Sequence, residues 1–170
     1  MPKSYRHESD TMGTVEVPLN ALWGAQTQRS LSNFSIGEER IPIEIIFAIV
    51  KIKQAAAISN YKLGVLNEYK KNLIVDACTL ILKGLHNDEF PLKVWQTGSG
   101  TQTNMNVNEV ISNLAAISNG EELGSHKLLN PNDDVNKSQS TNDVFPAAIQ
   151  IATFEEIQSK LLPEIKLLID

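Results

Sequence analysis

Apolar residues recur at three- and four-residue steps through most of the chain after Pro42, and this spacing predicts a mainly α-helical fold. Helices are expected over 42–63, 68–85 and 104–118, and from 140 to the last residue. Glycine or asparagine lies near the end of the first three, as is typical of helix C-termini. The 170 residues are enough for one domain with a usable core.

The first 40 residues lack this spacing, and we predict an irregular arm there. Gly13, Pro18, Gly24 and Gly37 interrupt the segment. Alternating polar and apolar residues over 14–17 are compatible with one short strand, or a short β-hairpin, within the arm.

The last expected helix, over 140–170, is unusually apolar. Pro163 should kink or break it, because proline inside a helix removes a hydrogen bond. Its apolar side needs partners that the preceding helices are too few to provide, so we interpret it as one member of a bundle whose other helices lie outside this sequence. A non-catalytic module that binds a partner helix would explain the same pattern. The apolar side consists of Ala147, Ala148, Ile151, Phe154, Leu161, Ile165 and Leu168.

Composition and charge argue against several kinds of function. A net charge of −5 with interspersed signs argues against nucleic-acid binding. No apolar run approaches the roughly 18 residues of a membrane span, and the first residues lack the apolar stretch of a signal peptide. The single cysteine, Cys78, cannot form an intrachain disulfide, which fits a reducing compartment. We therefore expect a cytoplasmic protein in which Cys78 is a small buried residue.

Titratable side chains offer few candidates for metal binding or catalysis. His7, His86 and His126 lie in polar surroundings without metal-ligand spacing, so we expect surface histidines and no metal site. Arg29 could pair with a substrate carboxylate through two hydrogen bonds. A structural ion pair with an acidic side chain is the alternative that we favour.

Two polar segments stand immediately before helical patterns: GSGTQTN over 98–104 and SQSTND over 138–143. Glycines allow close backbone approach, and hydroxyls, amides and helix N-termini can donate to a carboxylate or phosphate. Neither segment has the pattern of a Walker loop or of a dinucleotide fingerprint. Ordinary helix capping explains part of both. A cap needs only one polar residue, however, and the excess before Val144 favours ligand binding.

A third polar segment, Asn130-Pro131-Asn132-Asp133, lies in the loop between the last two expected helices. A plain proline turn and a site are equally acceptable interpretations of it.

Four strings, taken together and in this order, resemble the fumarase/aspartase superfamily, and within it the class II fumarate hydratases. They are RHESDTMGTVEVP, LWGAQTQRS, VWQTGSGTQTNMNVNEV and NPNDDVNKSQSTNDVFP. The resemblance runs from about Arg6 to the last residues. In the neighbouring aspartate ammonia-lyases the glycine segment typically reads G-A-G-T-S, so Ser99 and Gln102 favour the fumarases.

The resemblance implies a carbon–oxygen lyase that adds water to fumarate reversibly, giving L-malate without a cofactor. It implies a homotetramer in which each active site combines segments of three subunits around a central bundle. Residues 1–139 would be the N-terminal domain, with the arm over 1–40 and helices over 42–139, and 140–170 the first bundle helix. The implied substrate-binding residues are Ser99, Gly100, Thr101, Ser140, Thr141 and Asn142. The implied secondary anion site consists of Asn130, Pro131, Asn132 and Asp133.

Two departures from the family pattern limit what these residues can do. Asn130 replaces the histidine that usually begins the secondary site, so a proton-switchable donor is lost there. The family chain is more than twice as long, and its histidine base and its mobile G-S-S loop have no counterpart in residues 1–170. General acid–base chemistry needs such groups within hydrogen-bond reach. We therefore expect no catalytic residue here and no activity of this N-terminal portion alone. A fragment of an aspartate ammonia-lyase is the alternative.

Overall fold

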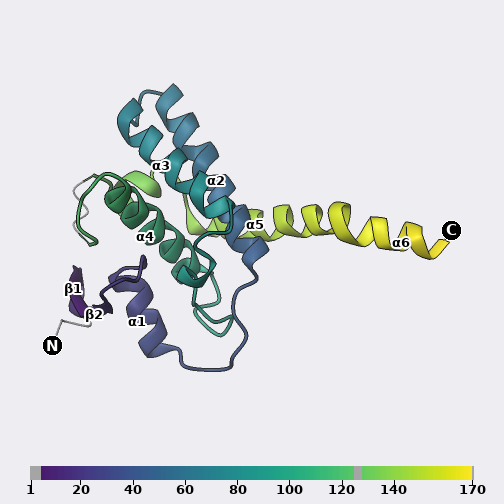
Figure 1. The fold of residues 1–170 in the computed structure, drawn as a ribbon, viewed down its shortest axis with the longest axis horizontal. Coiled ribbons are helices and arrows are strands. Elements are labelled where there is room, and N and C mark those ends of the chain that lie inside the picture. The colour runs from purple at the N-terminus through teal and green to yellow at the C-terminus, as the bar shows by residue number, and fades with distance from the viewer. Residues whose placement is uncertain (1–4, 125–127, 170) are drawn as a thin grey trace.

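The computed structural model describes residues 5–124 and 128–169, and it confirms the mainly α-helical prediction (Figure 1). The elements in chain order are β1 (Tyr5–Asp10), β2 (Gly13–Pro18), α1 (Ala25–Asn33), α2 (Ile43–Lys62), α3 (Glu68–Leu82), the short turn η1 (Asn87–Glu89), α4 (Thr101–Ser118), η2 (Pro131–Val135), α5 (Thr141–Glu156), η3 (Ile157–Leu161) and α6 (Leu162–Ile169). In this part of the chain, no helix combines the length and the apolar character needed to cross a lipid bilayer.

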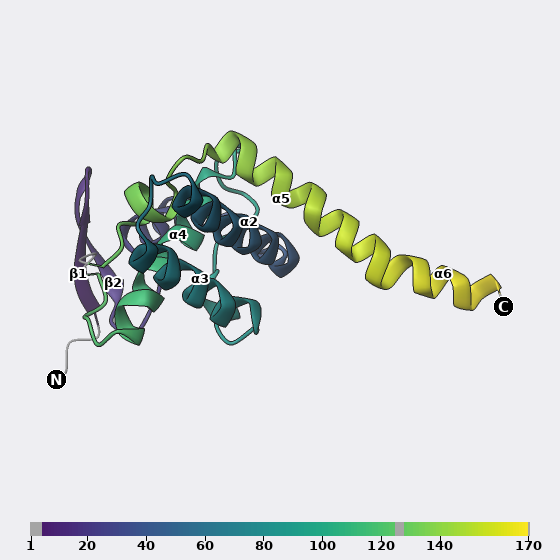
Figure 2. The same ribbon diagram turned by 90° about the horizontal axis from the view of Figure 1, so that it is seen from above.

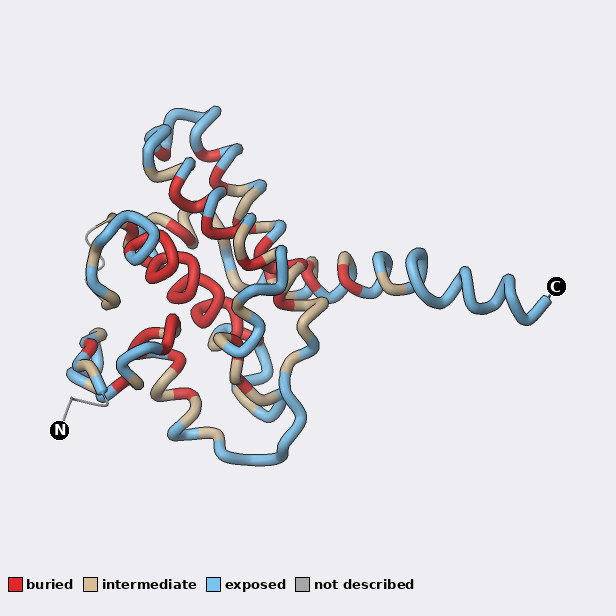
Figure 3. Tube along the Cα trace, viewed as in Figure 1, coloured by how far each residue is buried: buried red, intermediate tan, exposed pale blue. Residues whose placement is uncertain are grey.

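The centre of the molecule is α4, which is buried along nearly its whole length (Figure 3). It contacts α1, α2, α3, α5 and η2. Its buried polar side chains bind the backbone of surrounding loops, as when Asn113 Nδ2 donates to Leu22 O at 2.9 Å and Ser112 Oγ to Leu129 O at 2.6 Å. Buried polar groups need such partners, so these bonds fix the loops on the helix.

The short β-hairpin that the sequence analysis gave as one possibility for the arm is present. Strands β1 and β2 pair antiparallel, from Tyr5 opposite Pro18 to Asp10 opposite Gly13. Gly13 has a φ of +110°, a backbone conformation that glycine adopts at low cost. The Arg6 side chain leaves the hairpin and donates to Trp23 O at 2.7 Å, which ties the sheet to the segment before α1.

The prediction of an irregular arm over 1–40 is wrong, because α1 lies within it. The helix has a largely polar sequence, AQTQRSLSN, and Gly24 at its start supplies no side-chain cap. Its cap is Glu109 in α4, 85 residues further along the chain, whose carboxylate accepts from the Gly24 amide. No local pattern reveals a cap of this kind.

Two helix ends also differ from the prediction. Helix α4 begins at Thr101, three residues before the expected Asn104, and α3 ends at Leu82. The early start of α4 is stabilised by a side chain from the preceding loop. Gln96 Oε1 accepts from the Thr103 amide at 3.1 Å and so satisfies one of the first amides of the helix.

The elements α5, η3 and α6 form one continuous helical arm that projects from the body (Figure 2). Pro163 was predicted to kink or break the helix, and of these two outcomes the break is absent. In the π-helical turn η3, the Leu162 amide donates to Ile157 O, five residues back, and the helix passes through the proline with its hydrogen bonding shifted. The first part of α5 packs on α2 and α4, where Val144, Ala148 and Ala152 are buried. Further along the arm the apolar side chains are exposed, as expected for a helix without partners: Phe154 64%, Leu161 51%, Leu167 70% and Leu168 86%.

Candidate functional site

The structure brings the two polar segments singled out in the sequence into contact. Asn104 in the first turn of α4 donates through Nδ2 to Thr141 Oγ1, the first residue of α5, at 3.0 Å. Gly100 lies against Phe145, so closely that a Cβ at Gly100 would stand 2.3 Å from the ring carbon Cγ. With a φ of +69° as well, this position is suited to glycine alone. Two helix starts about 40 residues apart in sequence therefore adjoin.

The hydroxyl groups at these helix starts keep protons available for a ligand. Thr141 Oγ1 accepts from Asn104, and Ser140 Oγ accepts from the Asn142 amide at 3.3 Å. A hydroxyl that accepts one hydrogen bond can still donate its own. Ser99 Oγ and Thr101 Oγ1 lie 2.8 Å apart, so one of the two donates to the other and the second retains a free proton. Ser99, Thr101, Ser140 and Asn142 are exposed. Together with Thr141 they form a surface of hydrogen-bond donors at the two helix starts, which we call the donor surface.

A buried lysine lies beneath this donor surface. Lys53 of α2 is 0% exposed, and its Nζ donates to Asn136 Oδ1 at 2.7 Å. Asn104 Nδ2 donates to the same oxygen at 3.0 Å. Burial lowers the pKa of Lys53 to about 7, and the nearby Cys78 opposes that shift. Sequence reasoning missed Lys53, although its place four residues after Ile49, on the apolar side of α2, was a usable signal.

Two side chains of α4, Glu109 in the middle of the helix and Gln102 in its first turn, hold helix α1 and the residue before it. The Glu109 carboxylate accepts from the amides of Gly24, Gln26 and Thr27 at 2.9, 2.8 and 3.2 Å, and from Thr27 Oγ1 at 2.6 Å. Burial raises the pKa of Glu109, and these four hydrogen bonds oppose the shift. Ser30 Oγ donates to Gln102 Oε1 at 2.6 Å, next to Thr101 in the first turn of α4.

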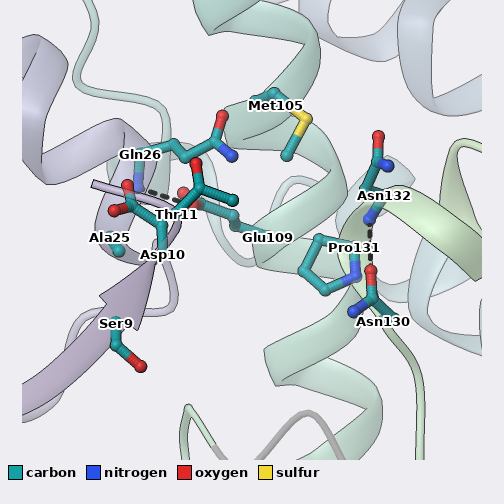
Figure 4. Close-up of a pocket in the computed structure, with 10 residues that line it drawn as sticks. All are labelled: Ser9, Asp10, Thr11, Ala25, Gln26, Met105, Glu109, Asn130, Pro131 and Asn132. Carbon is teal, nitrogen blue, oxygen red and sulfur yellow. Dashed lines mark hydrogen bonds between the residues drawn. The ribbon is translucent and has the colours of Figure 1, made fainter. Parts of the chain in front are cut away.

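The predicted secondary site lies elsewhere, in a cavity between the hairpin, α1, α4 and η2 (Figure 4). Asn130, Pro131 and Asn132 line it, and Asp133 does not. Asn130 Oδ1 accepts from the amides of Asn132 and Asp133 at 2.8 and 2.9 Å, so the side chain occupies the donors at the start of η2. The carboxyl groups of Asp10 and Glu109 also line the cavity. Both features disfavour an anion.

Arg29 forms the structural ion pair that we favoured from the sequence, with its Nε 3.0 Å from Asp10 Oδ2. Burial alone would raise the pKa of Asp10, but the hydrogen bond from Arg29 brings it below its ordinary value.

Cys78 is 0% exposed, as expected, and burial raises its pKa to about 12. His7 is exposed, His86 is half-buried, and His126 lies outside the described residues.

Fold and site together define a helical domain with a buried central helix and hydroxyl and amide donors at two adjoining helix starts. The family model described as lyase matches residues 13–170. The chain belongs to this lyase family.

Curated relatives named class II fumarate hydratase match nearly the whole chain. The protein from Prochlorococcus marinus subsp. pastoris (strain CCMP1986 / NIES-2087 / MED4) is 65% identical over 98% of this chain and 36% of its own length. The Staphylococcus aureus (strain COL) protein is 53% identical over 97% of this chain and 36% of its own length. The chain thus spans about a third of the length of these relatives.

Solved structures agree with the fold. The class II fumarase from Schistosoma mansoni superposes with a TM-score of 0.91 at 42% identity, over 95% of this chain and 34% of that one. The native fumarate lyase:delta crystallin from Brucella melitensis gives a TM-score of 0.87 at 42% identity, over 91% of this chain and 36% of that one.

Proposed function

We propose that these residues belong to a fumarate hydratase, a carbon–oxygen lyase that adds water to fumarate reversibly to give L-malate. The observation that supports it best is the junction of two helix starts, where Asn104 binds Thr141 and several hydroxyl protons remain available. The names of the curated relatives agree with this assignment. The substrate-binding residues in this proposal are Ser99, Gly100, Thr101, Ser140, Thr141 and Asn142.

Water addition to fumarate depends on hydrogen-bond donors that face the reacting carboxylate, and it does not require cationic side chains at the protein surface. Water addition to fumarate passes through a carbanion whose charge spreads into the adjacent carboxylate. Preorganised neutral donors stabilise such charge without reorganising as it develops. Ser140 caps α5, so the N-terminal dipole of that helix also favours an anion there.

Residues 1–170 supply binding groups in this proposal and no catalytic base. The base would come from other parts of a longer polypeptide, in a homotetramer whose sites combine several subunits. The exposed apolar side chains of the arm, such as Phe154 and Leu168, would then be covered by bundle helices. We expect only weak anion binding at the secondary site, since Asn130 already occupies the amides of Asn132 and Asp133.

A chimera tests the proposal. Residues 1–170 would replace the matching segment of the Prochlorococcus marinus relative, and fumarate loss would be followed by absorbance. Hydrogen bonds to charged groups contribute about 1.5–3 kcal/mol, so Thr101→Ala and Asn142→Ala should each lower kcat/KM roughly 10- to 150-fold. Thr79→Ala is the matched control, because the exposed Thr79 hydroxyl donates to Val75 O in its own helix and accepts from Gln54 Nε2 of α2, and contacts neither of the two helix starts. A chimera that deaminates aspartate and hydrates no fumarate would refute the assignment.

A further inference from the structure

Lys53 is buried in a position where a lysine is costly. It lies in the middle of α2 with 0% of its surface exposed, whereas lysines are almost never fully buried without a paired charge. Among residues 5–124 and 128–169, no ion pair involves it. Its hydrogen bond there is to a neutral oxygen, Asn136 Oδ1.

Three carboxylates on the neighbouring elements are engaged elsewhere, and Asp76 of α3 and Asp143 of α5 are exposed. Glu155 of α5 pairs with Lys51 at 2.5 Å, and Asp134 of η2 pairs with Lys70 at 2.7 Å. Glu109 of α4 binds the start of α1. The titratable group that acts on Lys53 is the Cys78 thiol of α3, whose own pKa is raised to about 12 by burial, so it stays neutral. The described part of the chain therefore gives the Lys53 ammonium no anionic partner.

The contacts of Lys53 lead directly to the donor surface. Its ammonium fixes Asn136 Oδ1, which also accepts from Asn104 Nδ2. The same Asn104 nitrogen donates to Thr141 Oγ1, so the Thr141 proton must point away from Asn104. Asn104 Oδ1 is buried without a hydrogen-bond partner among the described residues. The network formed by Lys53, Asn136, Asn104 and Thr141 therefore contains one acceptor that no donor in it satisfies.

We propose that Lys53 is a positioning residue that, through Asn136 and Asn104, holds the Thr141 hydroxyl as a donor to the dicarboxylate and supplies the positive charge beneath it. This inference rests on the proposed function and deepens it. A dianion bound above the helix starts provides the counter-charge that residues 5–124 and 128–169 do not supply. Binding of the anion and protonation of Lys53 then favour each other reciprocally.

The coupling has a definite pH dependence. The pKa of Lys53 is about 7, so the ammonium form is lost as pH rises through neutrality. Affinity for the dianion should fall over the same range. Bound L-malate should raise the pKa of Lys53, so that binding at pH 7.5–8 takes up a proton.

The experiment uses the active chimera and three variants. Lys53→Met should lower kcat/KM for fumarate about tenfold at pH 6, mainly through KM, and should remove the decline above pH 7. Lys53→Arg, which stays charged, should keep most of the low-pH value and lack the decline. Lys51→Met, two residues away in the exposed pair with Glu155, is the control and should match the parent.

Calorimetry of L-malate binding in buffers of different ionisation enthalpy gives a second readout. Proton uptake near pH 7.5 in the parent should disappear in Lys53→Met, or in Lys53→Gln if the first variant does not fold. No uptake in the parent would overturn the inference, as would a Lys53 variant with lower thermal stability but an unchanged pH profile. An inactive parent chimera would instead count against the proposed function.

Discussion

The Glu109 carboxylate joins the start of α1 to α4, and Glu109→Gln should weaken that junction. Oε2 accepts from the Gly24 amide and from the amide and hydroxyl of Thr27, while Oε1 accepts from the Gln26 amide. A glutamine can keep three of these donors on its oxygen. Its NH2 group must then face the amide of Gln26, and two donors cannot bind each other.

The expected loss follows from these contacts. An unpaired amide costs about 1–3 kcal/mol, and removing a negative charge from the N-terminus of α1 costs about 0.3–1 kcal/mol. We therefore expect Glu109→Gln to reduce the free energy of unfolding by roughly 1.3–4 kcal/mol, and Tm by roughly 3–16 °C for a chain of this size. Amide exchange in α1 should accelerate more than exchange in α3, which Glu109 does not touch.

Urea unfolding followed by circular dichroism at pH 7 measures the effect. Glu122→Gln is the control, because Glu122 is exposed and lies in the loop after α4. Burial raises the pKa of Glu109, and a carboxyl that were neutral in the folded protein would be mimicked by glutamine. A change within about 0.5 kcal/mol of the parent would therefore refute the reasoning that a charged carboxylate caps α1.

Three further outcomes can be checked on the same protein. Gly100→Ala should lower Tm, since its Cβ would meet the Phe145 ring at 2.3 Å and overpacking costs about 1–3 kcal/mol; Gly98→Ala, with nothing within 4 Å, should not. The folded pKa of Lys53, about 7, lies below its unfolded value. The unfolded chain thus binds more protons above neutrality, and stability to urea should rise between pH 7 and 10 by up to about 1.4 kcal/mol per unit, a slope absent from Lys53→Met. The Cys78 thiol should react with a thiol reagent only on unfolding, because it is 0% exposed with a pKa of about 12.

Local signals in the sequence predict the helices well and the site in part. The spacing of Ile45, Ile49 and Ile52 predicts α2 because an apolar side repeats every 3.6 residues whatever the helix packs against. The excess of polar residues before Val144 predicts a special helix start, and Ser140 is indeed the cap of α5. Such features depend on neighbours within one or two turns, so one sequence is enough to find them.

What the sequence does not predict depends on contacts between distant segments. Helix α1 is short and largely polar, and its cap is Glu109, which lies 85 residues further along the chain. The support beneath Thr141 joins Lys53, Asn104 and Asn136, which come from three separate segments of the chain. Asn104 and Asn136 each have an ordinary explanation on their own, as a helix-start residue and a loop amide, and the position of Lys53 on the apolar side of α2 does not reveal its partners. Only their common placement shows a network.

Deprotonation of Lys53 should change the stability of the fold and the affinity for a dianion in opposite directions. Measuring both therefore distinguishes a role in ligand binding from a role in the fold alone. Deprotonation removes the penalty for burying a charge without an anionic partner, so stability should increase above neutrality. The same deprotonation removes the charge beneath the donor surface, so affinity for a dianion should decrease over the same range. A lysine that only filled space in α2 would give the first slope without the second. Measuring urea stability and kcat/KM across one pH series therefore decides whether the buried amine serves the fold alone or the site above it.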